Sequence, residues 1–266
     1  RSASIILEPV GKNTAPAITI AALKSIKENE NAILLVLSAD HLIKNMEKFH
    51  QAIESAKKQA ENNKLVTFGI FPDKVETGYG YIEANISKDK DYSLINEFVE
   101  KPDYKSAQKY ISSGKYFWNS GMFMFKASVF LEELEMYEPE ILGACKKSYQ
   151  NEYHDLDFLR LNEEEFLNCP SKSIDYAVME RTKNAVMVCL DADWSDIGSW
   201  SALYDISESD YNGNVIKGDV IVKDTVNTYI DAKHHMVATI GLDNIVIIDT
   251  PDVTFVSSKE KAHEVK

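Results

Sequence analysis

The chain has 266 residues, of which 44% are hydrophobic and 27% are charged, as in ordinary folded domains. Its net charge of -13 argues against a nucleic-acid-binding protein, because phosphate contacts need a basic surface. No apolar run approaches the ~20 residues of a membrane span, and the three cysteines form no CxxC pair, so we expect a cytoplasmic protein with free thiols.

The chain as far as Phe71 alternates helix and strand patterns. Residues 15–28 carry apolar side chains at helical spacing, with Pro16 in the expected first turn, and residues 48–62 form a second amphipathic pattern. Residues 33–37 are five consecutive apolar residues, which fit a strand buried on both faces, and residues 65–71 form another short apolar strand. This order predicts an α/β domain with right-handed crossovers.

The middle of the chain continues the alternation. A glycine pair, Gly78 and Gly80, precedes a predicted strand through Ile82, and residues 94–99 are its expected partner. Pro102 and Asp103 predict a turn. The other elements expected here are strands over 118–125 and 185–190, and helices over 104–112, 129–137, 141–149 and 174–181.

The composition shifts after Tyr211. A turn signal at residues 212–214 is followed by short Val/Ile-rich runs with no long helix between them. We therefore expect two parts, a core over 1–212 and a small β-rich extension over 213–266. The apolar extension suggests a homodimer surface, and the Lys/Glu-rich residues 259–266 predict a solvated helix or tail.

Two aspartates follow predicted strands. Asp40 comes after residues 33–37, and Asp196 follows the strand expected over 185–190. In open α/β sheets, ligands bind beyond the carboxyl ends of strands, and carboxylates there suit a hard cation. Asp40 could equally cap the next helix, and Asp196 could stabilise its own turn. If the two converge, they predict a magnesium site for a triphosphate.

Four other residues suit a phosphorylated sugar. Lys101 could reach a phosphate oxygen, and the amide of Asn119 could pair with sugar hydroxyls. Gly80 offers bare backbone for a close approach. Glu100 adjoins Lys101, so along a regular strand their side chains would face opposite ways. Each also has an ordinary alternative, as a surface lysine, a turn asparagine or a simple turn glycine.

Familiar nucleotide and hydrolase signatures are absent from the sequence. There is no GxxxxGK[ST] loop, GxGxxG fingerprint, HExxH pair or GxSxG elbow. Asp191 and Asp193 match the loose DxD pattern of metal-dependent glycosyltransferases. That pattern keeps sugar transfer from a nucleotide sugar as an alternative function.

Seven segments in this order resemble the mannose-1-phosphate guanylyltransferases, a family of sugar nucleotidyltransferases. Each motif is modest alone, but their number, order and spacing make the joint match specific. The segments are residues 8–17, 38–41, 77–82, 98–102, 118–123, 173–180 and 194–200.

The resemblance implies a Rossmann-like α/β nucleotidyltransferase core with a mixed central sheet. It also implies formation of GDP-mannose and pyrophosphate from GTP and mannose-1-phosphate. By carry-over, Asp40 and Asp196 would hold Mg²⁺, and Lys101 would meet the sugar phosphate. The hexose hydroxyls would contact Glu100, Asn119 and the Gly80 backbone, and the guanosine would lie near Glu8, Asn13 and Thr14.

The sequence departs from the family in two places. Ser38 stands where the family usually has Pro, beside a proposed metal ligand. The chain begins at Arg1, without an initiator Met, and lacks the family's glycine-rich loop with its Arg and Lys, so we expect a missing N-terminal segment. A non-catalytic regulatory paralogue that binds GDP-mannose therefore remains an alternative function. The preferred nucleotide base and the presence of an isomerase domain after this chain are also left open.

Overall fold

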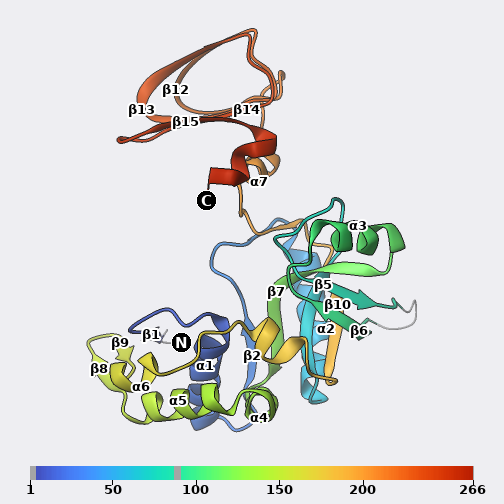
Figure 1. Cartoon of the computed structure of the whole chain (residues 1–266), viewed down its shortest axis with the longest axis vertical. Coiled ribbons are helices and arrows are strands. Elements are labelled where there is room, and N and C mark those ends of the chain that lie inside the picture. Colours follow the sequence, from blue (N-terminus) through green and yellow to red (C-terminus); the bar gives the residue numbers. More distant parts are fainter. Residues whose placement is uncertain (1–3, 87–90, 266) are drawn as a thin grey trace. The chain divides into compact units, whose positions relative to one another are not determined.

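The structure is a computed structural model that describes residues 4–86 and 91–265 (Figure 1). The chain forms two compact units. The first unit runs to Ala39 and then from Lys44 to Ala192, and the second combines Asp40–Ile43 with Asp193 onward. The chain therefore passes between the units three times.

A six-stranded sheet is the centre of the first unit. Its order is β2-β7-β4-β10-β6-β5, and the long strand β7 pairs with β5 as well. β4 and β10 are parallel, whereas the other neighbours are antiparallel, so the expected mixed sheet is confirmed. The strands are β2 (Ile33–Val36), β4 (Leu65–Ile70), β5 (Tyr81–Ala84), β6 (Ser93–Val99), β7 (Tyr116–Lys126) and β10 (Ala185–Cys189).

Burial along the strands follows their position in this sheet. All six residues of the inner strand β4 are buried, which explains its continuous apolar run. β2 lies at the sheet edge, and its residues are only half-buried. The prediction of a strand buried on both faces at 33–37 is therefore wrong, and Leu37 lies exposed beyond the strand.

The helices of this unit begin at polar caps. The Asn13 side chain accepts from the Thr14 amide, the Asn45 side chain from the Lys48 amide and the Asp103 side chain from the Ser106 amide. Helix α1 packs against α4 and α5 in the main apolar core. The helices are α1 (Thr14–Glu28), α2 (Met46–Glu61), α3 (Tyr104–Ser113), α4 (Ala127–Tyr137), α5 (Pro139–Gln150) and α6 (Glu163–Leu167).

Two smaller elements of this unit bear on the candidate site. A three-stranded sheet has the order β1-β9-β8, built from β1 (Ile5–Leu7), β8 (Tyr153–Asp155) and β9 (Phe158–Arg160). The helix expected at 174–181 is a single π turn, η1 (Asp175–Met179), in which the Glu180 amide donates to the Asp175 carbonyl. Such turns are rare and are often found at functional sites.

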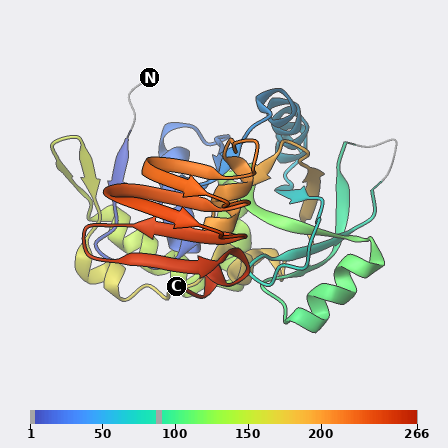
Figure 2. The same cartoon turned by 90° about the horizontal axis from the view of Figure 1, so that it is seen from above.

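The second unit is β-rich, as expected. Its short strands β3 (Leu42–Ile43) and β11 (Trp194–Ser195) are antiparallel and precede helix α7 (Trp200–Ile206). Strands β12, β13 and β14 pair in parallel, and β15 closes the edge antiparallel (Figure 2). These are β12 (Val215–Lys223), β13 (Tyr229–Ile240), β14 (Ile245–Asp249) and β15 (Thr254–Ser258).

Neighbouring residues of β13 serve two separate apolar clusters. Tyr229 packs in one cluster with Val246 and Ala262, and Ile230 packs in the other. Ala262 belongs to the 3-10 helix η2 (Lys259–Val265) and is 1% exposed. The prediction of a solvated helix is therefore confirmed for the exposed residues Glu260, Lys261 and Glu264, whereas Ala262 faces inward and closes a core.

Candidate functional site

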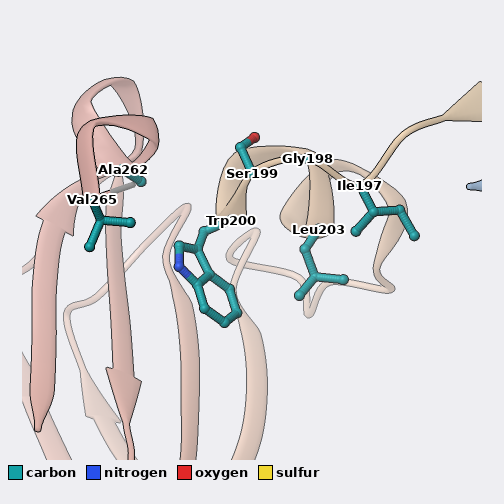
Figure 3. A pocket seen from close by; sticks show the side chains of 7 residues that line it. All are labelled: Ile197, Gly198, Ser199, Trp200, Leu203, Ala262 and Val265. Atoms are coloured by element: carbon teal, nitrogen blue, oxygen red, sulfur yellow. The ribbon is translucent and has the colours of Figure 1, made fainter. Parts of the chain in front are cut away.

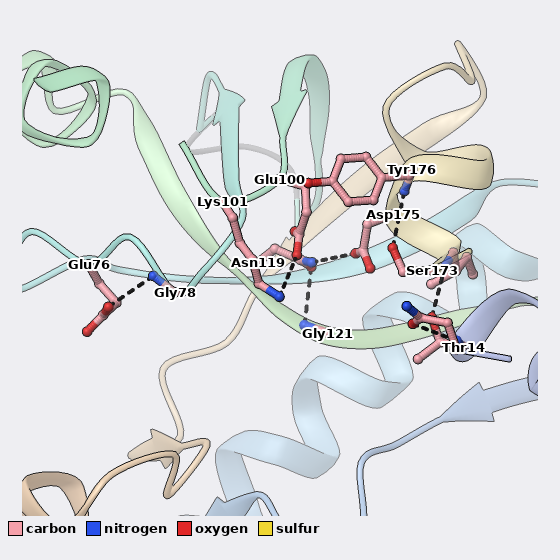
Figure 4. Close-up of polar contacts among 12 residues, drawn as sticks. Thr14, Glu76, Gly78, Glu100, Lys101, Asn119, Gly121, Ser173, Asp175 and Tyr176 are labelled. Atoms are coloured by element: carbon pink, nitrogen blue, oxygen red, sulfur yellow. Dashed lines mark hydrogen bonds and ion pairs between the residues drawn. The ribbon is translucent and has the colours of Figure 1, made fainter. Parts of the chain in front are cut away.

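Glu100 and Lys101 come together where strand β6 ends. The strand stops at Val99, and Lys101 adopts a left-handed backbone with φ 46°. Its ammonium therefore folds back to 3.5 Å from a carboxylate oxygen of Glu100 (Figure 4). The alternation that would separate two strand neighbours does not apply here. The Lys101 side chain is 59% exposed, so its charge is open to a ligand.

Gly80 lies directly beneath the Glu100 carboxylate. A Cβ at Gly80 would come within 2.5 Å of the Glu100 Oε2 and 3.3 Å of the Asn119 Cβ. The backbone amide of Asn119 donates to the Gly80 carbonyl at 2.8 Å. The structure thus brings four residues together from the start of β5, the end of β6 and the middle of β7, namely Gly80, Glu100, Lys101 and Asn119.

The side chain of Asn119 is held on both sides. Its Oδ1 accepts from the Thr67 hydroxyl at 2.9 Å and from the Gly121 amide at 3.2 Å. Its Nδ2 donates to the Asp175 carboxylate at 2.9 Å. The side-chain amide is therefore oriented, with oxygen towards donors and nitrogen towards an anion.

Three carboxylates lie close to one another beside this asparagine. The Glu100 amide donates to Glu180 at 2.9 Å. Burial, and then repulsion from Asp175, raise the pKa of Glu100 to about 7, although Lys101 opposes the shift. Burial also raises the pKa of Asp175, against its bond from Asn119. The Glu100 carboxyl is therefore the member of this cluster whose pKa lies near neutral pH.

The segment expected near the guanosine is partly committed to structure. The Asn13 side chain caps α1, a common role for asparagine at the start of a helix. The Thr14 hydroxyl accepts from the Ile174 amide at 2.9 Å, so this segment lies beside the π turn. Glu8 has a buried Oε1 that makes no hydrogen bond within the described residues, and burial raises its pKa.

Asp40 and Asp196 both belong to the second unit. Strands β3 and β11 pair Leu42 with Ser195, so the two aspartates flank adjacent short strands. Both carboxylates act electrostatically on His41, whose ring nitrogen accepts from the Trp194 indole at 3.2 Å. Burial nevertheless lowers the pKa of His41, which keeps it neutral as that acceptor.

The aspartate pair fits one kind of metal site and not another. Within residues 4–86 and 91–265, no group of three or more His, Cys, Asp or Glu side chains could hold a metal ion. Mg²⁺, however, is usually bound through one or two carboxylates, with water and substrate phosphates as its other ligands. Asp40 and Asp196 supply the two carboxylates that this second arrangement needs, although the Asp196 Oδ1 also accepts from the Gly198 amide at 3.0 Å, the turn role that was its alternative.

An apolar pocket of about 240 Å³ begins one residue after Asp196 (Figure 3). It lies within the second unit, between the start of α7 and helix η2. None of its lining side chains is charged, so it does not suit a phosphate. Its lining residues are Ile197, Gly198, Ser199, Trp200, Leu203, Ala262 and Val265.

The two aspartates of the DxD pattern belong to different units and have different local roles. The Asp191 carboxylate pairs with the Lys48 ammonium in the first unit. Asp193 belongs to the second unit and adopts a left-handed turn with φ 50°. Within the first unit, the Asp191 carboxylate is thus engaged with a lysine.

The polar partners of the candidate residues were not predicted from the sequence. Asp175 and Thr67 hold Asn119, and His41 with Trp194 lies beside the two aspartates. One signal was available for Asp175, because this residue lies in the segment 173–180 that resembles the family. The Thr67 contact had none, because it depends on how β4 and β7 pair.

Two family models match this chain. The Nucleotidyl transferase model matches residues 2–213, and the MannoseP isomerase/GMP-like beta-helix domain model matches residues 218–266. A mannose-1-phosphate guanylyltransferase from Salmonella montevideo is 50% identical over 271 residues, which cover 100% of this chain and 57% of that protein. The chain thus spans little more than half the length of that relative.

Two solved structures are also similar to this chain. One described as a mannose-1-phosphate geranyltransferase from Thermus thermophilus is 32% identical, with a TM-score of 0.85, over 97% of this chain and 75% of that one. A mannose-6-phosphate isomerase from Helicobacter pylori is 36% identical, with a TM-score of 0.67, over 73% of this chain and 75% of that one. None of the helices in the described parts of the chain is long and apolar enough to cross a membrane.

Proposed function

Because this chain belongs to the nucleotidyl transferase family, and within it to the mannose-1-phosphate guanylyltransferases, we propose that the protein makes GDP-mannose. A phosphate oxygen of mannose-1-phosphate attacks the α-phosphorus of GTP in line. The bond from that phosphorus to the β-phosphate oxygen breaks, and pyrophosphate leaves. The observation that carries the proposal is the convergence of Glu100, Lys101, Asn119 and Gly80 in one cluster.

This cluster offers what a sugar phosphate needs. The exposed ammonium of Lys101 can bind the phosphate, and the carboxylate of Glu100 can accept hydrogen bonds from hydroxyls. Asn119 adds an oriented amide donor. The attacking oxygen is already an anion, so no general base is required. Catalysis by these residues then consists of positioning and charge neutralisation.

Asp40 and Asp196 would hold Mg²⁺. When bound, the ion neutralises charge on phosphate oxygens. The support is their shared position beside His41 and the preference of this ion for carboxylate oxygens. A homodimer, a cytoplasmic location, the use of GTP and contacts from Glu8, Asn13 and Thr14 to the guanosine also stay predictions.

The test of the metal role replaces Asp196 in the complete protein. Asp196→Asn should lower GDP-mannose formation by about two orders of magnitude, the size expected when a group that stabilises transition-state charge is lost. The matched control is Asp193→Asn, since asparagine tolerates the left-handed turn of Asp193 and the proposal gives that residue no role. Pyrophosphate release and thermal melting would both be measured.

Two results would contradict the proposal. Near wild-type turnover in Asp196→Asn would remove the metal role. No GDP-mannose from GTP, mannose-1-phosphate and Mg²⁺ with a folded wild-type protein would remove the function itself. Transfer of the sugar from a nucleotide sugar to an acceptor, without release of pyrophosphate, would instead favour the glycosyltransferase alternative.

A further inference from the structure

The side-chain amide of Asn119 can donate two hydrogen bonds, and only one of them is used. Within the part of the chain that the structure describes, its Nδ2 donates once, to Asp175. Its Oδ1 is occupied by the Thr67 hydroxyl and the Gly121 amide. The second Nδ2 hydrogen is therefore the part of this side chain that can serve a ligand.

The opposite orientation of the side-chain amide is disfavoured at two contacts. A rotated Asn119 would turn its NH₂ towards the Gly121 amide, so that two donors would face each other. It would also turn its oxygen towards the carboxylate of Asp175. Of these two contacts, the one to Asp175 is charge-assisted and is the stronger. Asp175 therefore decides which way the amide faces.

The π turn explains why Asp175 can reach Asn119. The turn starts at Asp175, and its bond from the Glu180 amide to the Asp175 carbonyl places these residues one π turn apart. Glu180 accepts from the Glu100 amide, while Asp175 accepts from Asn119. The turn is itself held by Thr14, which accepts from the Ile174 amide. The π turn and its C-cap residue Glu180 thus contact β7 and the end of β6 through side chains.

We propose that Asp175 is a positioning residue, which fixes the Asn119 amide so that its second hydrogen faces a hydroxyl of the sugar phosphate. The inference rests on the proposed function of this cluster and adds a residue to which no role was assigned from the sequence. Asp175 acts through Asn119, and Glu180 keeps the end of β6 against the same turn.

A double-mutant cycle in the complete protein tests this coupling. Asp175→Ala, Asn119→Ala and the double variant would be compared for KM of mannose-1-phosphate, KM of GTP and kcat. Asp175→Ala should raise the KM of mannose-1-phosphate about tenfold, the loss expected for one charge-assisted hydrogen bond, with the KM of GTP within about twofold. In the Asn119→Ala background, Asp175→Ala should change neither KM further.

The conservative variant Asp175→Asn is the control for a merely structural role. Its side-chain oxygen can still accept from Asn119, so it should restore the KM of mannose-1-phosphate to within about threefold of wild type. The proposal is overturned if Asp175→Ala raises both KM values alike and Asp175→Asn does not restore them. It is also overturned if the full effect persists without Asn119. A wild-type protein that makes no GDP-mannose would instead defeat the underlying function.

Discussion

Glu100 and Lys101 meet because the chain leaves strand β6 at Val99, just before both residues. A left-handed backbone at Lys101 costs about 1–2 kcal/mol for a residue with a side chain, and the fold retains it. This conformation places the Lys101 ammonium 3.5 Å from the Glu100 carboxylate, which would point the other way in a regular strand. Residue types and their order could be identified from the sequence, whereas this geometry could not, because alternation predicts the opposite.

Lys101→Ala should mainly weaken the use of mannose-1-phosphate. The exposed ammonium is screened by water, so we expect a rise in its KM of about tenfold and not more. The KM of GTP should stay near wild type. Lys105→Ala, which removes an exposed lysine from α3, is the matched control. Steady-state kinetics that show unchanged use of mannose-1-phosphate in Lys101→Ala would remove this residue from the proposed site.

Glu100→Gln should change how stability depends on pH. Folding raises the pKa of Glu100 from its ordinary value of 4.5 to about 7. The protonated carboxyl therefore contributes its full stabilisation below pH 4.5, and that contribution is lost as the pH rises through 7. The Tm of Glu100→Gln relative to wild type should therefore increase between pH 5 and pH 8, by the equivalent of about 1–3 kcal/mol.

The control for this pH series is Glu132→Gln, because Glu132 is an exposed glutamate on α4. Its Tm difference from wild type, measured over the same pH range, is the reference for the series. If the Tm difference for Glu100→Gln changed no more with pH than this reference, burial would not raise the pKa of Glu100 in the folded state.

Helices and strands with a regular apolar pattern could be predicted from the sequence, whereas irregular elements could not. Helices α1 and α2 follow from apolar spacing, since each buries one face, and the inner strand β4 follows from its continuous apolar run, since it is buried on both faces. The π turn at Asp175 has no sequence period of its own and was expected as an ordinary helix. The edge position of β2 and the burial of Ala262 depend on tertiary neighbours, which a local pattern does not contain.

Gly80→Ala tests how closely β5, β6 and β7 approach at the cluster. The added methyl group would displace the Glu100 carboxylate, a flexible group, and press on Asn119. We expect a folded protein with a Tm within a few degrees of wild type and a KM for mannose-1-phosphate raised about tenfold or more. Gly143→Ala is the control, since a Cβ at that helical glycine meets nothing within 4 Å. Normal kinetics in Gly80→Ala would mean that Glu100 need not lie where it does.

At the scale of the whole chain, the candidate residues divide between two compact units. Gly80, Glu100, Lys101 and Asn119 belong to the α/β unit, whereas Asp40 and Asp196 belong to the β-rich one. Asp40 does so because the short segment Asp40–Ile43 leaves the first unit and pairs with β11. The β-rich unit is therefore more than an appendage, since both proposed metal ligands depend on its folding.

Gly218→Ala should separate the contributions of the two units. Gly218 has φ 90°, and an added methyl would overlap the Ala232 carbonyl where β12 and β13 pair. Strain and overpacking together should destabilise the β-rich unit by about 2–5 kcal/mol. Hydrogen exchange should then accelerate in β12 to β14 while β4 stays protected, and GDP-mannose formation should fall steeply.

The control is Gly241→Ala. Because Gly241 also has a positive φ but open space around its Cβ, this substitution should cost only the backbone strain. Full activity together with accelerated exchange in Gly218→Ala would show that the two aspartates do not need this unit intact.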